Sequence, residues 1–319
     1  MMVVLTHSPK PYAADGYILS GISLLTAPCI GLFFMVSGAL LLPVTVPTKL
    51  FLKQRLKKIV LPLLFWSLLY MVVDYGETGN TESFGRMLLS LPFSVQGNGA
   101  FWFIYVLIGL YFLAPVISPW LQKITRKELE FFLSLWLATM CYPLLRSFID
   151  IDQKDTGILY YFSGYAGYFL LGYYLRHYAG RLPKGLQAVM LLLPPGIAAV
   201  CKTAGIELDF YDVFGYLSVM VAMMCVAWFV IIKQGTEKSR ARNDVMRKML
   251  TNFSNYSFGI YLIHIFIVRG VLWKFNLELI PHGGGIAETF VLGTVLSYAA
   301  IYLIAGIPKA EYLIGYRRK

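Results

Sequence analysis

The chain has 319 residues, of which 58% are hydrophobic and only 14% are charged, and its mean hydropathy is +0.64. A soluble domain has about 45–50% apolar and about 25% charged residues, so this composition excludes an ordinary globular protein and indicates a polytopic membrane protein. The net charge of +11 would favour nucleic-acid binding in a soluble chain. Here the basic residues follow the loops in a topological pattern, and we expect no nucleic-acid partner.

Apolar runs of the length that crosses a bilayer as a helix, about 17–25 residues, recur along the whole chain. Nine are predicted, at residues 18–42, 59–75, 100–121, 129–148, 158–178, 187–205, 212–232, 253–275 and 286–308. Residues 1–8 give a tenth run that, at roughly 12 Å of helix, is too short to span alone. Either the start is truncated or misassigned and the helix is completed upstream, or the first helix is a stub. The predicted fold is all-α, because lipid offers the backbone no hydrogen-bond partners: a polytopic transmembrane helix bundle forming one domain over residues 1–319, with nine full spans and a truncated first span.

The charged residues predict the orientation of these spans. One alternating set of segments carries 21 of the 28 Lys and Arg residues and five of the 17 acidic ones, a net charge of +16, whereas the rest of the chain carries −5. By the positive-inside rule the basic set lies in the cytoplasm, and the C-terminus lies there with it. The basic set consists of residues 43–58, 122–130, 176–186, 233–252 and 309–319.

The first predicted helix carries His7 in an apolar stretch that Pro9 and Pro11 end. The predicted topology places His7 in the outer half of the membrane, where an ionisable side chain is costly and is therefore a functional candidate. Neutral imidazole can take a proton from a hydroxyl, so His7 is a candidate general base. The alternative is a histidine that lies at the membrane interface at a helix end.

The second run contains the sequence Phe33-Phe34-x-x-Ser37-Gly38. Small residues let helices approach closely, and the aromatic rings fill volume. The stretch is therefore either a packing motif or part of the wall of a binding channel.

The loop that follows is basic and contains no acidic residue. Arginine and lysine bind phosphates through charge-assisted hydrogen bonds, which makes the loop a candidate site for a phosphate-rich donor. The alternative is that it anchors the protein at anionic lipid. Its basic residues are Lys49, Lys53, Arg55, Lys57 and Lys58.

Aromatic and charged residues mark the outer ends of several spans. Trp102 and Tyr105 begin the run 100–121, where they either belong to an interfacial aromatic belt or stack on a sugar. Arg146 and Glu288 lie near the outer ends of their own runs. Each of these two could pair with an opposite charge, extend to the interface or bind a sugar hydroxyl.

A late span carries His264, which lies three residues after Tyr261 on the same helix face. Arg269 follows further outward. Ionisable groups at this depth need partners, so the set is either a structural tie or a polar acceptor pocket. Carboxylates that could serve as partners are Glu288, Asp74 and Asp212.

Cysteines and histidines do not predict a metal site. Cys29, Cys141, Cys201 and Cys225 lie in or beside apolar runs at no metal-ligand spacing, which is typical of small buried side chains. The four histidines are divided between the two sides of the membrane, so we expect no metal. Neither a Walker loop, a Gly-x-Ser-x-Gly elbow nor a dinucleotide fingerprint is present, and we expect no tightly bound cofactor.

Together these stretches resemble the acyltransferase 3 family, the multi-span bacterial O-acyltransferases that modify surface polysaccharides. Each stretch is weak alone, but the ordered set is specific. The family has an arginine on the cytoplasmic side of its first-helix histidine, which we expect in the upstream extension. The matching stretches run in family order: Val3–His7, Gly31–Gly38, Arg55–Pro62, Phe101–Tyr105, Leu110–Pro115, Gly167–Tyr174 and Ser257–His264.

The resemblance implies transfer of an acyl group, expected to be acetyl, from cytoplasmic acyl-CoA to a hydroxyl of a lipid-linked or cell-surface sugar. Acetyl-CoA would be a donor substrate, and the protein would lie among lipids of the bacterial inner membrane. His7 would match the family's essential histidine, and Arg55 and Lys58 its basic loop. We expect the acyl-CoA site to include Lys53, Phe34 and Ser37 as well, and the acceptor side to include His264, Tyr261, Trp102, Arg269 and Glu288.

Two other functions fit the same composition. A transporter or flippase of a lipid-linked sugar would contain paired broken helices and would not depend on coenzyme A. A non-catalytic membrane scaffold would tolerate substitution of His7 and Arg55. Within the acyltransferase interpretation, direct transfer and a transient acyl-enzyme both remain open.

Overall fold

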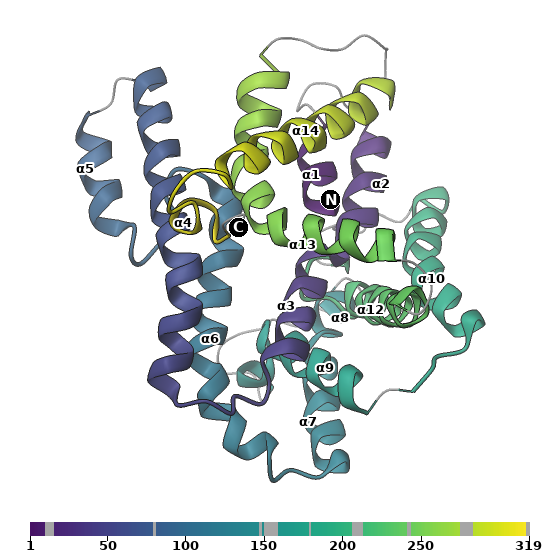
Figure 1. The fold of residues 1–319 in the computed structure, drawn as a ribbon. Helices are drawn as coiled ribbons and strands as arrows, with labels where there is room; N and C mark the ends of the chain where they lie inside the picture. The colour runs from purple at the N-terminus through teal and green to yellow at the C-terminus, as the bar shows by residue number, and fades with distance from the viewer. Residues whose placement is uncertain are drawn as a thin grey trace. The chain divides into compact units, whose positions relative to one another are not determined.

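The structure is a computed structural model that describes residues 1–9, 16–78, 81–146, 149, 159–178, 180–205, 213–240, 244–274 and 283–316. Within these residues every regular element is a helix and none is a strand (Figure 1), which confirms the all-α prediction. Eight helical stretches of the described chain are long and apolar enough to cross a membrane, as a polytopic bundle requires. They are Gly21–Leu41, Thr48–Asp74, Gly99–Leu121, Arg126–Leu145, Lys184–Thr203, Val219–Thr236, Leu250–Leu272 and Gly285–Ile304.

The remaining prediction, a span over residues 158–178, is the one that differs. Its described part contains a 3₁₀ turn, η2 (Tyr160–Phe162), and the 12-residue helix α9 (Ala166–His177). Twelve residues extend about 18 Å, which is shorter than a hydrocarbon core of about 30 Å. Gly164, whose φ is +99°, lies between the two elements, and this backbone conformation does not continue an α-helix.

The helices pack as two compact units. The first unit comprises Met1–Ala14, Val46–Leu113 and Asp244–Lys319, and the second comprises Asp15–Thr45 and Ala114–Asn243. The helix α6 (Trp102–Leu121) begins in the first unit and ends in the second. The expectation of one domain over residues 1–319 stays a prediction.

The first unit contains the N-terminal helix, the long helix α4 and the C-terminal helices. The five basic residues that were predicted to form a loop, from Lys49 to Lys58, are helical and belong to the first turns of α4. α1 packs against both α13 and α14, and α15 packs against α4 and α13. The elements are α1 (Met2–His7), α4 (Thr48–Thr78), α5 (Thr81–Ser90), η1 (Gly99–Phe101), α13 (Asp244–Ile265), the π-helical segment η3 (Phe266–Leu272), α14 (Gly283–Ile304) and α15 (Glu311–Ile314).

The helix α13 passes into η3 where a side chain enters its backbone ladder. The Tyr70 hydroxyl, on α4, accepts a hydrogen bond from Phe266 N at 2.9 Å and donates one to the Leu262 carbonyl at 3.1 Å. These are the amide and carbonyl that an α-helix would pair directly. Beyond this point the turns widen, and Trp273 N donates to the Val268 carbonyl at 2.9 Å.

The segment before α6 is fixed to its neighbours in the first unit. Asn98 accepts a hydrogen bond from Ala100 N at 3.0 Å and so caps η1, while the Tyr261 hydroxyl donates to the Ala100 carbonyl. Gly97 has a φ of +73°, and a Cβ at this position would lie 2.7 Å from the Ser67 carbonyl oxygen. Only glycine fits here, and the tight turn holds Tyr261 in place.

The second unit is centred on the pair α3 and α9. α3 packs against α9 and α12, and α10 packs against α12. Its elements are α2 (Gly16–Thr26), α3 (Pro28–Leu41), α7 (Arg126–Thr139), α8 (Tyr142–Arg146), η2, α9, α10 (Lys184–Thr203) and α12 (Val219–Arg240).

The helices α3 and α9 cross with their backbones in contact. A Cβ on Gly38 would lie 1.8 Å from the Phe169 carbonyl oxygen, and one on Gly172 would lie 1.9 Å from the Met35 carbonyl oxygen. Both distances are far below van der Waals contact, so each crossing position requires glycine. The contact supports the packing interpretation of Gly38 in the sequence Phe33-Phe34-x-x-Ser37-Gly38.

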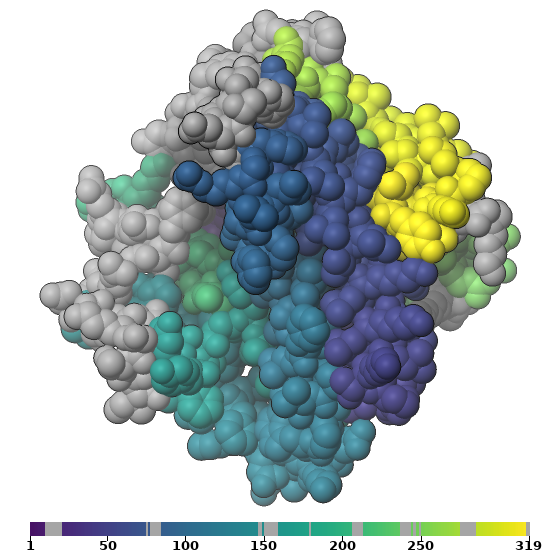
Figure 2. Space-filling view, turned by 90° about the vertical axis from the view of Figure 1, so that its left-hand side faces the viewer, coloured from purple at the N-terminus to yellow at the C-terminus, as the bar shows by residue number. Residues whose placement is uncertain are grey.

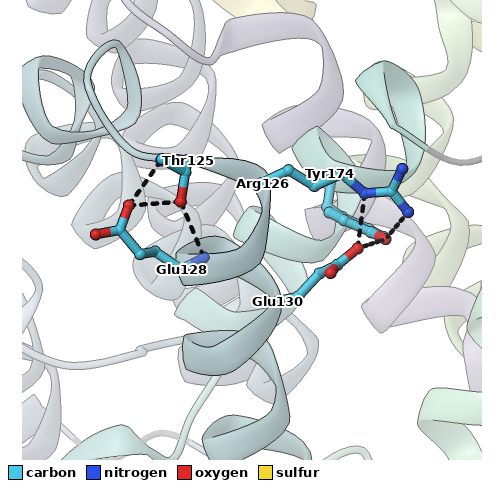
Figure 3. Close-up of polar contacts among 5 residues, drawn as sticks. All are labelled: Thr125, Arg126, Glu128, Glu130 and Tyr174. Carbon is cyan, nitrogen blue, oxygen red and sulfur yellow. Dashed lines mark hydrogen bonds and ion pairs between the residues drawn. The ribbon is translucent and has the colours of Figure 1, made fainter.

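Side-chain hydrogen bonds fix the start of α7 and join it to α9 in the second unit (Figure 3). Thr125 and Glu128 form a capping box at the start of α7. Arg126 donates to Glu130 at 2.8 Å, and the Tyr174 hydroxyl of α9 donates to the same carboxylate at 2.6 Å. These bonds join α7 to the C-terminal end of α9.

Candidate active site

Two histidines from opposite ends of the sequence meet in the first unit. His7 is the last residue of α1, His264 is the penultimate residue of α13, and their ring centroids lie 5.4 Å apart. The end of α1 is held by Trp273, whose indole N–H donates to the Ser8 carbonyl at 3.3 Å. Thus two residues that the sequence predicted as separate candidates form one pair.

The hydrogen-bond partner of His264 defines its tautomer. Nδ1 lies 2.6 Å from the Tyr261 carbonyl oxygen, which can only accept, so a neutral ring has its hydrogen on Nδ1 and leaves Nε2 as an acceptor. The side chain is fully buried, and among the described residues Nε2 has no hydrogen-bond partner. Buried polar atoms are usually bonded, so this nitrogen is a candidate contact for a ligand.

Arg269 gives the histidine pair a nearby positive charge. It lies on η3, exposed, with Nη2 3.5 Å from His7 Nδ1 and its guanidinium 5.4 Å from the centre of the Trp273 ring. The π-helical turns bring Arg269 to this position, and such turns are frequent at functional sites. The side chains that meet here come from α1, α13 and η3.

The other predicted acceptor-side residues lie on elements of the same unit. The Tyr261 ring packs edge-on against Phe103 with centroids 4.9 Å apart. Trp102, half-buried, begins α6. Glu288, also half-buried, lies on α14, which packs against both α1 and η3. Asp212, a predicted carboxylate partner, and His282 lie outside the described residues.

A cationic pocket lies at the start of α4. Its volume is about 440 Å³, and Arg55, Lys57 and Lys58 line it and are all exposed. The pocket therefore brings together three of the five basic residues predicted to bind a phosphate-rich donor. Lys53 is exposed on the same helix but is not among the described residues that line the pocket. The remaining lining residues are Gln54, Glu311 and Tyr312.

The second wall of this pocket is the C-terminal helix α15. Figure 2 shows the C-terminal segment, in yellow, directly against α4, in dark blue. The Trp66 indole N–H on α4 donates to the Leu313 carbonyl at 2.9 Å. Gly315, with a φ of +72°, lies so close to α4 that a Cβ there would be 2.9 Å from the Lys58 carbonyl oxygen.

Comparison with known families identifies the class of protein. Residues 1–307 match the acyltransferase domain of the acyltransferase 3 family, which is nearly the whole chain. The chain belongs to this family. No curated protein and no solved structure matched the chain in the corresponding searches. The family and the many apolar helices identify the protein as a multi-pass membrane acyltransferase.

Two predicted donor-site residues of this acyltransferase lie in the second unit. Phe34 is fully buried on α3, and its ring packs against Tyr165 with centroids 5.1 Å apart. Ser37 is half-buried on the same helix. Their role in donor binding stays a prediction, and the observed role of Phe34 is to fill the core of its unit.

Sequence reasoning missed the contribution of α15 to the acyltransferase's cationic pocket. Glu311 and Tyr312 are more than 250 residues from Lys58, and no motif joins them. The one available signal was topology, because the positive-inside pattern predicts that residues 43–58 and 309–319 lie on the same side of the membrane.

Proposed function

We propose that the protein is an O-acyltransferase that moves an acetyl group from cytoplasmic acetyl-CoA to a hydroxyl of a lipid-linked or cell-surface sugar in a bacterial envelope. Membership of the acyltransferase 3 family supports acyl transfer by a membrane protein. The observation that carries the proposal is the His7–His264 pair, which shares one compact unit with a pocket of three cations.

The long helix α4 connects these two places. Lys58 lines the cationic pocket, and Tyr70 bonds to Leu262 and Phe266, the residues on either side of His264. The twelve residues from Lys58 to Tyr70 rise by about 18 Å along the helix. This separation suits a donor whose phosphates and thioester lie at opposite ends of an extended arm.

In the proposed reaction His7 is the general base. Its imidazole takes the proton of the sugar hydroxyl while the oxygen attacks the thioester carbonyl. The C–S bond then breaks, the acetyl group stays on the sugar oxygen as an ester, and the coenzyme A thiolate takes up the proton. The cations at Arg55, Lys57 and Lys58 would hold the donor phosphates.

The acceptor is proposed to lie against His264 and Arg269. A sugar has several hydroxyls, and a second one could donate a hydrogen bond to the buried Nε2 of His264, which has no other partner among the described residues. The Trp273 ring, already in contact with Arg269, offers an apolar face for stacking. Tyr261, Trp102 and Glu288 are expected to shape the same side.

The proposal is tested by replacing His7 with Ala in the purified protein. General-base help is worth on the order of 10²–10⁴-fold, so kcat for acetyl transfer should fall by that factor. Thiol release from acetyl-CoA and mass spectrometry of the acetylated glycan measure the two halves of the reaction. Thiol release also distinguishes the enzyme from a transporter, which would not consume acetyl-CoA.

The matched control is His177→Ala. This histidine lies at the end of α9 in the second unit, with Nδ1 3.0 Å from the Tyr173 carbonyl oxygen. Activity should be unchanged. Wild-type activity of His7→Ala at normal expression would remove His7 from the proposed role.

A further inference from the structure

The helix α15 lies outside the residues that match the acyltransferase 3 family, yet it supplies part of the cationic pocket. The family match ends at residue 307, whereas Glu311 and Tyr312 line the pocket together with residues of α4. The family assignment therefore gives these two side chains no role. Their position beside three cations requires an explanation of its own.

The first observation is the state of Glu311. Its Oε2 atom is buried and, within the described residues, has no hydrogen-bond partner, although Arg55, Lys57 and Lys58 line the same pocket. A carboxylate near cations would ordinarily bond to one of them. The Glu311 side chain as a whole is half-buried, so a turn of its carboxylate would present this unpaired oxygen to a donor group on a ligand in the pocket.

The second observation is the position of Tyr312. Lys57 Nζ lies over the Tyr312 ring, 4.9 Å from its centre, so a cation occupies one aromatic face in the pocket. Aromatic rings stack on nucleic-acid bases, and cations bind the attached phosphates. A base that replaced the Lys57 amine on this ring would free that amine for a phosphate.

We propose that α15 recognises the base of a purine nucleotide. Tyr312 stacks on the purine ring, Glu311 accepts a hydrogen bond from its exocyclic amino group, and the α4 cations bind the phosphates. The inference rests on the proposed function, which supplies acetyl-CoA, an adenine nucleotide, as the donor. It adds a nucleotide-specificity element that is built from the C-terminal segment.

The pocket wall is anchored well enough for point variants to be informative. Leu313 accepts the Trp66 hydrogen bond through its backbone, and Ile314 is 1% exposed. Glu311 and Tyr312 are each only half-buried, so their side chains contribute little to this anchor. Changing them should leave α15 in place.

The test compares two donors in the purified full-length protein: acetyl-CoA and acetyl-pantetheine, which lacks the nucleotide. Tyr312→Leu and Glu311→Ala should each raise KM for acetyl-CoA about tenfold, which is the size expected for loss of one base contact. KM for acetyl-pantetheine should not change. Tyr312→Phe and Glu311→Gln, which keep the ring and an acceptor oxygen, should recover most of the affinity.

Tyr302→Leu on α14 is the matched control, because this tyrosine is 43% exposed and does not line the pocket. Equal changes with both donors, or no change with either, would overturn the base contact.

Calorimetric binding of coenzyme A separates this inference from the proposed function. A wild type that bound coenzyme A but transferred no acetyl group would refute the function alone, and the variants' Kd would still decide the base contact. A wild type that did not bind it would refute both.

Discussion

At the scale of single residues, the neutral ring of His264 has its hydrogen on Nδ1, because that atom lies 2.6 Å from the Tyr261 carbonyl oxygen. Its Nε2 has no hydrogen-bond partner among the described residues and can accept a hydrogen bond, but only from one direction. His7 is less buried and lies beside the exposed Arg269. In the proposed reaction we therefore assign proton transfer to His7 and orientation of the acceptor to His264.

A double-mutant cycle tests whether the two histidines serve one reaction. Residues that act together show non-additive losses, so His7→Ala, His264→Ala and the double variant should have similar residual kcat/KM values for the acceptor. His264→Ala alone should also raise KM for the acceptor. His7→Ala combined with His177→Ala is the additive control. Losses that multiply in the His7–His264 pair would contradict a shared site.

Residue types in the sequence indicated candidate site residues but not which of them meet. His7, His264 and Tyr261 were recognisable because polar residues are rare in apolar helices. That His7 meets His264, rather than a carboxylate, depends on how α1 packs between α13 and α14, and no local pattern encodes that packing. For the same reason the sequence did not distinguish Lys53 from Lys58, although of these two described residues Lys58 lines the pocket and Lys53 does not.

At the scale of elements, the crossing of α3 and α9 determines how closely the second unit packs. Gly38 and Gly172 face each other's helices with no room for a side chain. Such close approach replaces the hydrophobic driving force that is missing in lipid with van der Waals contact between backbones. The small residues predicted this contact, but the identity of the partner helix came from the structure.

Gly38→Ala should destabilise the second unit. The added methyl group would overlap the Phe169 carbonyl, and overpacking of this kind typically costs about 1–3 kcal/mol. Thermal unfolding in detergent should show a lower Tm than wild type. Gly109→Ala on α6 is the control, because a Cβ there meets nothing within 4 Å. An unchanged Tm for Gly38→Ala would show that the two helices are further apart than described.

The apolar runs predicted most elements for a simple physical reason, since a helix that crosses lipid must be apolar over its full length. Residues 158–178 also read as such a run, but the backbone at Gly164 divides it and leaves α9 with 12 residues. Hydropathy averages over a window and does not detect a single residue with positive φ. The π-helical turns of η3 were hidden for a similar reason, because they depend on Tyr70 from another helix.

At the scale of the whole molecule, segments that the charge pattern assigns to one side of the membrane lie next to one another within each unit. In the first unit α15 packs against α4, so residues 309–319 and 43–58, both predicted cytoplasmic, meet. In the second unit Lys233 donates to the Leu175 and Arg176 carbonyls at 3.0 and 3.1 Å, which joins two further basic segments. Segments assigned to one side by charge alone are thus neighbours in space.

Cysteine labelling tests this orientation. In a variant without the native cysteines, Phe93→Cys should react with a membrane-impermeant maleimide in cells whose outer membrane is permeabilised. Residue 93 is exposed and lies between the predicted spans 59–75 and 100–121, on the side opposite the basic segments. Lys123→Cys, exposed in a predicted cytoplasmic segment, should react only after the inner membrane is opened. The reverse pattern would place the basic segments outside and would invert the proposed donor and acceptor sides.

The Tyr70 hydroxyl on α4 determines how the helical segment η3 is wound. Without that one oxygen atom, Phe266 N and the Leu262 carbonyl could bond directly, and the wide turns of η3 would rewind into ordinary ones. An α-helix turns by about 100° per residue and a π-helix by less, so rewinding η3 would rotate its later residues and move Arg269 and Trp273 away from His7. The Tyr70 hydroxyl oxygen therefore determines which face of η3 is directed toward His7 and His264.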